Sequence, residues 1–189
     1  MEKPLFDATS FVEIDLTQGS ISSAGKDQLA LVPTKVLRAL EPSDALASAA
    51  SDWGHAHGRR LVARVDLDAD NTSLEALASH LGGTLAAFGM GRLSVEIRGS
   101  ALLFRAQGGG EPSLADGMSA LLEGFLAGYL SALGTQPFAA VHLGKDNDPG
   151  CRLFWAGNPD AAKEVRRMVA AGADPEGVIT ALGSREDGC

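Results

Sequence analysis

Two hairpin patterns on either side of one long apolar helix constrain the fold of this chain most. The first spans residues 93–104, where apolar and polar residues alternate up to a glycine-serine turn and an apolar run follows. The second pairs residues 138–143 with 151–155, and the apolar stretch 114–133 between the hairpins has the length of a helix. Hairpin-connected strands form antiparallel sheets, so we expect an α+β fold, an antiparallel sheet of hairpins with helices packed on one side.

The remaining segments predict an N-terminal β unit and several further helices. Residues 11–16 alternate weakly before a turn-rich segment, which predicts a hairpin that returns through 29–32. Proline and N-cap chemistry predicts helix starts at five places, Pro33, Pro42-Ser43-Asp44, the capping box Thr72-Ser73-Leu74-Glu75, Asn158-Pro159 and Asp174-Pro175. We expect a single domain over 1–189, with an N-terminal β segment at 1–32, an α+β core at 33–157 and a C-terminal helical extension at 158–189.

Charge and apolar patterning disfavour two classes of partner. Lys and Arg number 16 against 24 Asp and Glu, which leaves a net charge of −8 and no basic patch for a phosphate backbone. The longest apolar stretch, 118–133, is interrupted by Glu123, Gly124 and Gly128, so it is typical of a buried helix and not of a membrane span. We therefore expect no nucleic-acid partner and no membrane span. Two cysteines and no visible export signal favour a cytoplasmic location.

Potential metal-binding and catalytic residues are few. His55 and His57 diverge by about 200° on a helix, and Asp52 adds a carboxylate beside His55 without a third ligand. Cys151 has His142 on the neighbouring strand as its only candidate base, whereas a cysteine in an apolar strand is usually a small core residue. Neither glycine-rich segment has the features of a phosphate-binding loop. We predict no catalytic residue, no metal, no cofactor and no enzymatic activity.

Small residues in the long helix are the strongest indication of a recognition surface. Gly124 and Gly128 permit another element to pack unusually closely, and Phe125 and Tyr129 present large faces beside them. The close partner is either another segment of this chain, or an oligomer seam or ligand pocket. With Trp53 of an earlier helix, these residues are our candidates for ligand binding or an interface.

A first family resemblance rests on motifs in the middle of the chain. Residues 74–96, which contain the Gly89-Met90-Gly91 turn, and the later Leu121-Leu122-Glu123-Gly124-Phe125 resemble the core of the D-type accessory subunit of bacterial cellulose synthase. Met90 stands where that family usually has tryptophan. The resemblance implies a non-enzymatic accessory protein that forms a homo-oligomeric ring. Such a protein assists ordered glucan export in bacterial cellulose biosynthesis, with cellulose synthase components and glucan chains as partners.

A second resemblance rests on the later half of the chain. Residues 124–133, followed by Val141-His142-Leu143-Gly144 and Gly150-Cys151-Arg152-Leu153-Phe154, are similar to the 4-vinyl reductase domain family. Many members have a second cysteine on the strand after the helix, which this chain lacks. This resemblance implies a dimeric domain that binds a small hydrophobic ligand or acts as a scaffold.

Overall fold

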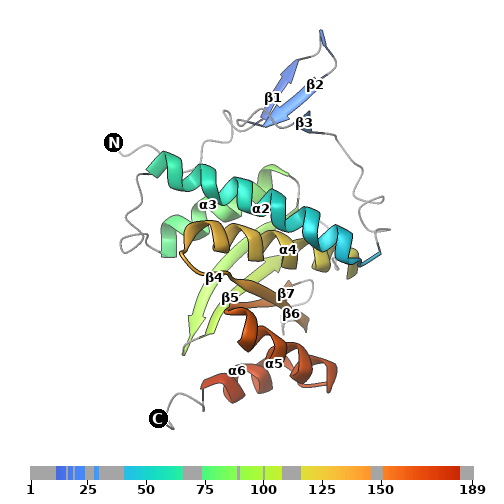
Figure 1. Cartoon of the computed structure of the whole chain (residues 1–189), viewed down its shortest axis with the longest axis vertical. Helices are drawn as coiled ribbons and strands as arrows, with labels where there is room; N and C mark the ends of the chain where they lie inside the picture. The colour runs from blue at the N-terminus through green and yellow to red at the C-terminus, as the bar shows by residue number, and fades with distance from the viewer. Residues whose placement is uncertain are drawn as a thin grey trace.

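The protein consists of a small N-terminal sheet, a larger four-stranded sheet and helices packed against the larger sheet (Figure 1). The computed structural model describes residues 12–15, 17–18, 20–23, 28–29, 41–65, 74–88, 90–99, 101–107, 116–145 and 151–183. The elements in chain order are β1 (Val12–Asp15), β2 (Ser20–Ser23), β3 (Gln28–Leu29), α2 (Asp44–Val65), α3 (Leu74–Ala87), β4 (Arg92–Arg98), β5 (Ala101–Gln107), α4 (Asp116–Leu133), β6 (Ala139–Lys145), β7 (Cys151–Gly157), α5 (Pro159–Ala170) and α6 (Pro175–Gly183).

The larger sheet has the strand order β4-β5-β7-β6, and every neighbouring pair is antiparallel. Both predicted hairpins are present, as β4-β5 and β6-β7. The pairing of β5 with β7 places the two hairpins side by side, although α4 and β6 separate these strands in the sequence. The predicted α+β fold, with helices packed against an antiparallel sheet, is confirmed.

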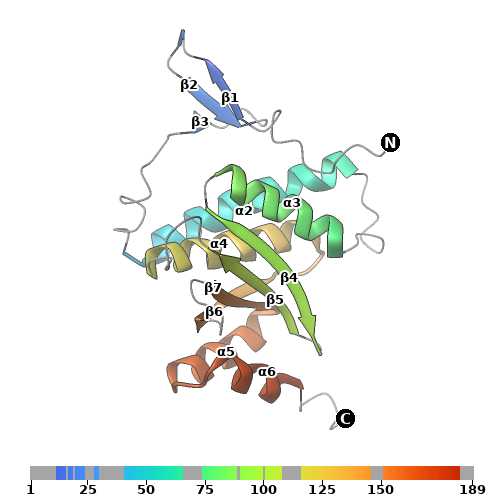
Figure 2. The ribbon, with the colours of Figure 1, turned by 180° about the vertical axis from the view of Figure 1, so that it is seen from behind.

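Helices cover both faces of this sheet (Figures 1 and 2). On what we call the α4 face, Phe104 and Phe154 pack into the core formed with α2, α3 and α4. On the opposite face, called the α5 face, Leu103 and Trp155 pack with residues of α5 and α6. Residues 101–104 of β5 and 153–156 of β7 are apolar on both faces, so both faces need cover from water there. The C-terminal extension thus adds a second helical layer to the one expected from the hairpins.

The N-terminal sheet differs from the predicted hairpin in its pairing. Strand β1 pairs with β2 at 20–23, inside the segment expected to be a long turn, and β2 then pairs with β3. The reason is a tight turn after β1. The Asp15 carboxylate accepts hydrogen bonds from the backbone amides of Thr17 and Gln18 and from the Thr17 hydroxyl. These bonds also lower the pKa of Asp15, the Thr17 hydroxyl most.

Side-chain caps explain three of the predicted helix starts. The Ser43 hydroxyl accepts from the Leu46 amide at 3.2 Å, and Asn158 Oδ1 accepts from the Ala161 amide at 2.8 Å. Asp174 Oδ1 accepts from the Gly177 amide at 2.7 Å. The predicted helix from Pro33, the capping side chains of Thr72 and Glu75, and the glycine-rich loop at 108–110 lie outside the described residues.

Candidate functional site

Helices α2 and α4 run in the same direction with their backbones almost in contact (Figure 1). A Cβ atom added to Gly128 would lie 1.9 Å from the Ser51 carbonyl oxygen, and one added to Gly54 would lie 2.1 Å from the Phe125 carbonyl oxygen. Backbone atoms cannot yield to such an approach without the helices separating. Four glycines, two on each helix, make this seam possible, namely Gly54, Gly58, Gly124 and Gly128.

The close packing expected at Gly124 and Gly128 is therefore made within the chain. Gly124 meets Ala47 of α2 and Gly128 meets Ser51 of α2, and both glycines are buried. Helix α2 covers them, so they do not present a surface to a second copy of the chain. The larger candidates, Phe125, Tyr129 and Trp53, lie together beside this seam.

These three side chains belong to a buried aromatic cluster between α2, α3 and α4. The Trp53 ring centroid lies 4.4 Å from that of Phe125, and the Phe125 ring stacks on Tyr129 with centroids 5.9 Å apart. His57 makes edge-to-face contacts with Trp53 and with Phe88, which follows α3, at 5.6 Å each. Phe125 and Tyr129 are fully buried, whereas Trp53 and Phe88 are half-buried. The cluster therefore reaches the surface at its Trp53–Phe88 edge.

A buried hydrogen bond joins this cluster to α3. His80 Nδ1 and the Tyr129 hydroxyl lie 2.7 Å apart, and the two rings are stacked. His80 is 3% exposed and Tyr129 is fully buried, so the bond is shielded from water. Burial raises the pKa of Tyr129 well above its ordinary value. A neutral phenol group in contact with a histidine can donate or accept a hydrogen bond as the histidine tautomer requires.

Thr84 adds a second hydroxyl to the same region. His80, Thr84 and Phe88 follow one another at four-residue spacing, so they lie on one side of α3. Thr84 is fully buried, and its hydroxyl has no hydrogen-bond partner among the residues that the structure describes. A buried hydroxyl without a partner costs about 1 to 3 kcal/mol, so such groups are rare unless a ligand or water uses them.

Removing the Tyr129 hydroxyl tests whether this residue is buried, because a buried tyrosine makes the free energy of unfolding depend on pH. Because the folded-state pKa of Tyr129 lies above its ordinary value of 10.0, the stability due to this group is complete below pH 10. It falls as the pH rises beyond 10, by about 1.4 kcal/mol per pH unit. We expect Tyr129→Phe to lack this alkaline decline in the free energy of unfolding, measured by urea titration between pH 8 and 11.

The absorbance of tyrosinate provides an independent readout of the same group. Tyr129 is the only tyrosine of the chain, so the signal near 295 nm reports this residue alone. In the wild-type protein, this absorbance should rise only when the protein unfolds. Tyrosinate formation near pH 10 in protein that is still folded would contradict the burial.

The remaining sequence candidates do not form a site. His55 is exposed and His57 is buried, as their divergence on α2 requires. Cys151 lies opposite Gln107 on the α5 face, whereas His142 contacts Phe154 and Arg152 on the α4 face. The considered Cys151–His142 pair is therefore separated by the sheet. Across the described ranges, no three or more His, Cys, Asp or Glu side chains group closely enough to hold a metal ion.

Sequence reasoning did not identify a half-buried carboxylate in α4 as a structural residue. Glu123 Oε1 accepts a hydrogen bond from the His142 backbone amide at 2.7 Å, next to the bulge in β6. Burial raises the pKa of Glu123, while the His142 amide and the Arg166 charge oppose this. The hydrogen bond of this side chain connects α4 to β6.

Sequence reasoning also missed His80 and Thr84. The available signal was their four-residue spacing before Phe88.

Comparison with known proteins supports the fold more than any specific activity. No protein-family model matches the chain, and no curated protein sequence matches it. Among solved structures, it is similar to the phenol-responsive sensory domain of the transcription activator PoxR, solved with phenol. The TM-score is 0.55 at 17% identity, over 86% of this chain and 94% of that one. At this identity, the similarity shows a shared fold.

A second solved structure is a vinyl-4-reductase family protein from Methanocaldococcus jannaschii. It matches with a TM-score of 0.41 at 12% identity, over 68% of this chain and 83% of that one. This neighbour belongs to the family of the second resemblance. Nothing in the comparisons supports the resemblance to the cellulose synthase accessory protein. In the part of the chain described, no helix is long and apolar enough to span a membrane.

Proposed function

We propose that this protein is a non-enzymatic domain that binds a small aromatic ligand in the cluster between α2, α3 and α4. The observation that carries the proposal is the Thr84 hydroxyl, which is buried without a described partner on the α3 side that contacts the cluster. Binding sites are mostly apolar and contain a few convergent polar groups, and this cluster has that composition. The shared fold with a phenol-responsive sensory domain supports the same class of function.

The ligand we propose has one aromatic ring and one hydroxyl group. Its ring would pack among Trp53, Phe88 and Phe125, whose edges and faces already favour aromatic partners. Its hydroxyl would bond to Thr84 and to the His80–Tyr129 pair. Because Phe125 and Tyr129 already fill their surroundings, binding requires the side chains to separate. The ligand would enter at the Trp53–Phe88 edge, because both side chains are half-buried.

Thr84→Val provides a sharp test because it should change stability and affinity in opposite directions. The replacement keeps the shape of the side chain and removes the unpartnered hydroxyl, so the free energy of unfolding of the ligand-free protein should stay constant or rise by about 1 kcal/mol. Its affinity for phenol, measured by isothermal titration calorimetry at pH 7, should fall about fivefold to tenfold. Toluene, which lacks the hydroxyl, should bind both proteins equally.

Ser119→Ala is the matched control for this experiment. Ser119 of α4 is also buried with no described hydrogen-bond partner, but it lies one helical turn before Glu123, on the side of α4 that bonds β6. The variant should bind phenol as wild type does. Absence of phenol binding to folded wild-type protein, or equal binding by the Thr84→Val variant, would refute the proposed site.

The proposal replaces the role in cellulose biosynthesis as the leading hypothesis. That role required an assembly surface, and the two glycines considered for it are covered by α2. A homo-oligomer, dimeric or larger, and a cytoplasmic location stay predictions. Native mass spectrometry of the purified chain measures the first of them directly.

A further inference from the structure

Strand β4 forms one edge of the larger sheet and pairs on its inner side with β5. An edge strand presents backbone N–H and C=O groups to which another strand can bond. Only residues 99–100 separate the paired Arg98 and Ala101, so this pair exchanges backbone hydrogen bonds beside the turn. Backbone direction alternates along a strand. The N–H and C=O groups of Val95 and Ile97 therefore point away from β5, toward the outer side of the edge.

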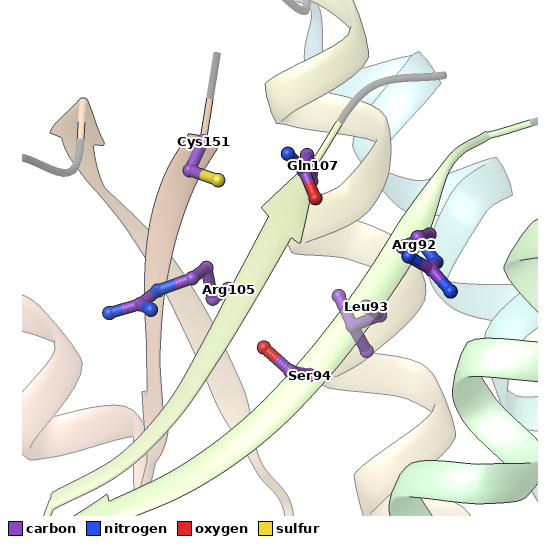
Figure 3. A pocket seen from close by; sticks show the side chains of 6 residues that line it. All are labelled: Arg92, Leu93, Ser94, Arg105, Gln107 and Cys151. Carbon is purple, nitrogen blue, oxygen red and sulfur yellow. The ribbon is translucent and has the colours of Figure 1, made fainter. Parts of the chain in front are cut away.

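Helix α3 lies close to the first half of this edge. By the same alternation Leu93 points its backbone groups outward, and its carbonyl oxygen would lie 3.1 Å from a Cβ added to Gly82 of α3. A strand from another molecule could not pair along this half without displacing α3. Ser94, in the same half, is exposed and borders a pocket of about 340 Å³ (Figure 3).

The second half of β4 is open and carries an exposed apolar side chain. Ile97 is 59% exposed, and it is the one exposed large hydrophobic residue in the ranges that the structure describes. Figure 2 shows that the turn end of the β4–β5 hairpin points away from α3. Residues 95–98 contain no proline or lysine, which commonly protect an edge strand from pairing. This half of the edge is therefore suited to strand addition.

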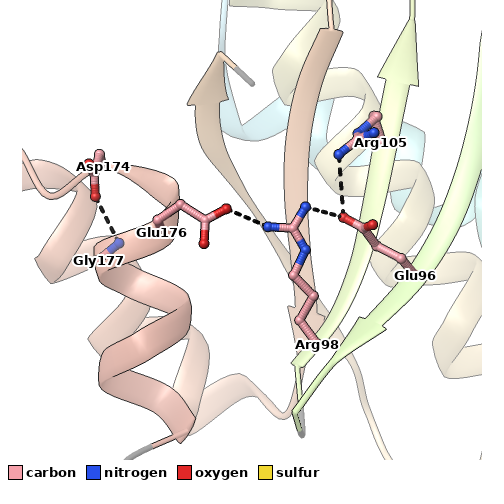
Figure 4. A network of polar contacts seen from close by, with 6 residues as sticks. All are labelled: Glu96, Arg98, Arg105, Asp174, Glu176 and Gly177. Atoms are coloured by element: carbon pink, nitrogen blue, oxygen red, sulfur yellow. Dashed lines mark hydrogen bonds and ion pairs between the residues drawn. The ribbon is translucent and has the colours of Figure 1, made fainter. Parts of the chain in front are cut away.

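Two charged residues give this half a pattern that is complementary to itself. Arg98 Nη2 lies 2.8 Å from Glu96 Oε1, and Arg98 also bonds Glu176 of α6 (Figure 4). This contact uses one oxygen of the Glu96 carboxylate, so Oε2 can accept from a second arginine. The Glu96 and Arg98 side chains are 34% and 30% exposed, so a strand added at the edge can reach both.

We propose that two copies of this chain form a dimer by antiparallel pairing of their β4 strands, about a twofold axis at Ile97. Ile97 pairs with Ile97 of the second copy, and the two residues exchange backbone hydrogen bonds. Glu96 of each copy lies opposite Arg98 of the other, so one twofold axis creates two opposite-charge pairs. The two four-stranded sheets then become one continuous sheet.

Charge and the position of α3 favour this register over its neighbours. A dimer centred on Val95 would set Arg92 opposite Arg98 of the second copy. One centred on Glu96 would set the two Glu96 side chains opposite each other. Like charges directly opposite one another destabilise a sheet. A dimer centred nearer the start of β4 would need the backbone groups of Leu93, which α3 approaches.

Charge reversal tests the dimer, by sedimentation velocity of the full chain at low salt. Wild-type protein should show a monomer–dimer equilibrium. Glu96→Arg and Arg98→Glu should each dimerise about tenfold more weakly or worse, because both opposite-charge pairs become like-charge pairs. An equimolar mixture of the two variants should recover the dimer, because the arginines of one variant then face the glutamates of the other. Thermal melting at a dilution where the chain is monomeric confirms that each variant is folded.

Cysteine cross-linking tests the register, in a Cys189→Ser background with Cys151 buried. The Cα atoms of a hydrogen-bonded antiparallel pair lie about 5.5 Å apart, within the range of a disulfide. Ile97→Cys should therefore form a cross-linked dimer with oxidised glutathione. Ser94→Cys is the matched control on the same strand. Its two copies would lie about 20 Å apart in the dimer, so it should not cross-link.

Three outcomes would overturn the proposal. The first is a wild-type chain that stays monomeric up to submillimolar concentration, which would leave the edge to a strand of another protein. The second is a mixture of the two charge variants that dimerises no better than either variant alone. The third is cross-linking of Ser94→Cys as readily as of Ile97→Cys, because this would place the axis elsewhere on β4.

Discussion

Replacing Gly128 with alanine should lower the free energy of unfolding by about 3 kcal/mol, although alanine is the better helix former. The added Cβ would lie 1.9 Å from the Ser51 carbonyl oxygen, and the atoms it meets are backbone. To relieve this clash, α2 and α4 must move apart, and this loosens the packing around Phe125 and Tyr129. For a chain of this length, the midpoint of thermal unfolding should fall by about 6 to 12 °C, measured by calorimetry.

Gly183→Ala is the control for this substitution. A Cβ at Gly183, the last residue of α6, meets no atom within 4 Å, so this variant gains helix propensity without a clash. It should melt at or slightly above the wild-type temperature. If the two variants melt alike, α2 and α4 do not pack as closely as described.

Phe125→Ala should have an effect at least as large, about 3 to 5 kcal/mol in the free energy of unfolding. Phe125 is fully buried and contacts Trp53, His57 and Tyr129, so its removal leaves a cavity at the centre of the aromatic cluster. The melting temperature should fall by about 6 to 20 °C. Benzene should recover part of this loss, because apolar cavities of this kind bind apolar molecules of matching size.

Ile97→Ala serves as the comparison for Phe125→Ala. Ile97 is 59% exposed on β4, so its truncation should change the free energy of unfolding by less than about 0.5 kcal/mol. Benzene should raise the melting temperature of this variant less than that of Phe125→Ala, because its aromatic cluster is intact and has no cavity to fill. An equal rise in melting temperature for both variants would mean that benzene acts elsewhere on the protein.

The secondary structure of the core could be read from local patterns. Alternation and turn residues identified β4-β5 and β6-β7, and the cap residues Asn158 and Asp174 marked the starts of α5 and α6. These features depend on neighbouring residues, so the sequence contains them directly. The prediction for the N-terminal hairpin was wrong in its pairing because a tight side-chain turn at Asp15 brings 20–23 back onto β1.

The candidate sites depend on contacts that no local pattern contains. Spacing alone showed that Gly124 and Gly128 permit close packing, and it left open whether the partner belonged to the same chain. The pairing of α4 with α2 decided that question, because it brings Ser51 within van der Waals distance of Gly128.

Other contacts between distant segments were equally hidden from local patterns. His80 lies 49 residues from Tyr129, and their hydrogen bond exists only because α3 and α4 share one face of the sheet. Cys151 and Arg92 border one pocket because β7 and β4 both flank β5. The sequence by itself determined the elements and their apolar faces, through interactions between near neighbours. Only the tertiary structure decided which side chains meet, because strand order and helix pairing depend on burying those faces together.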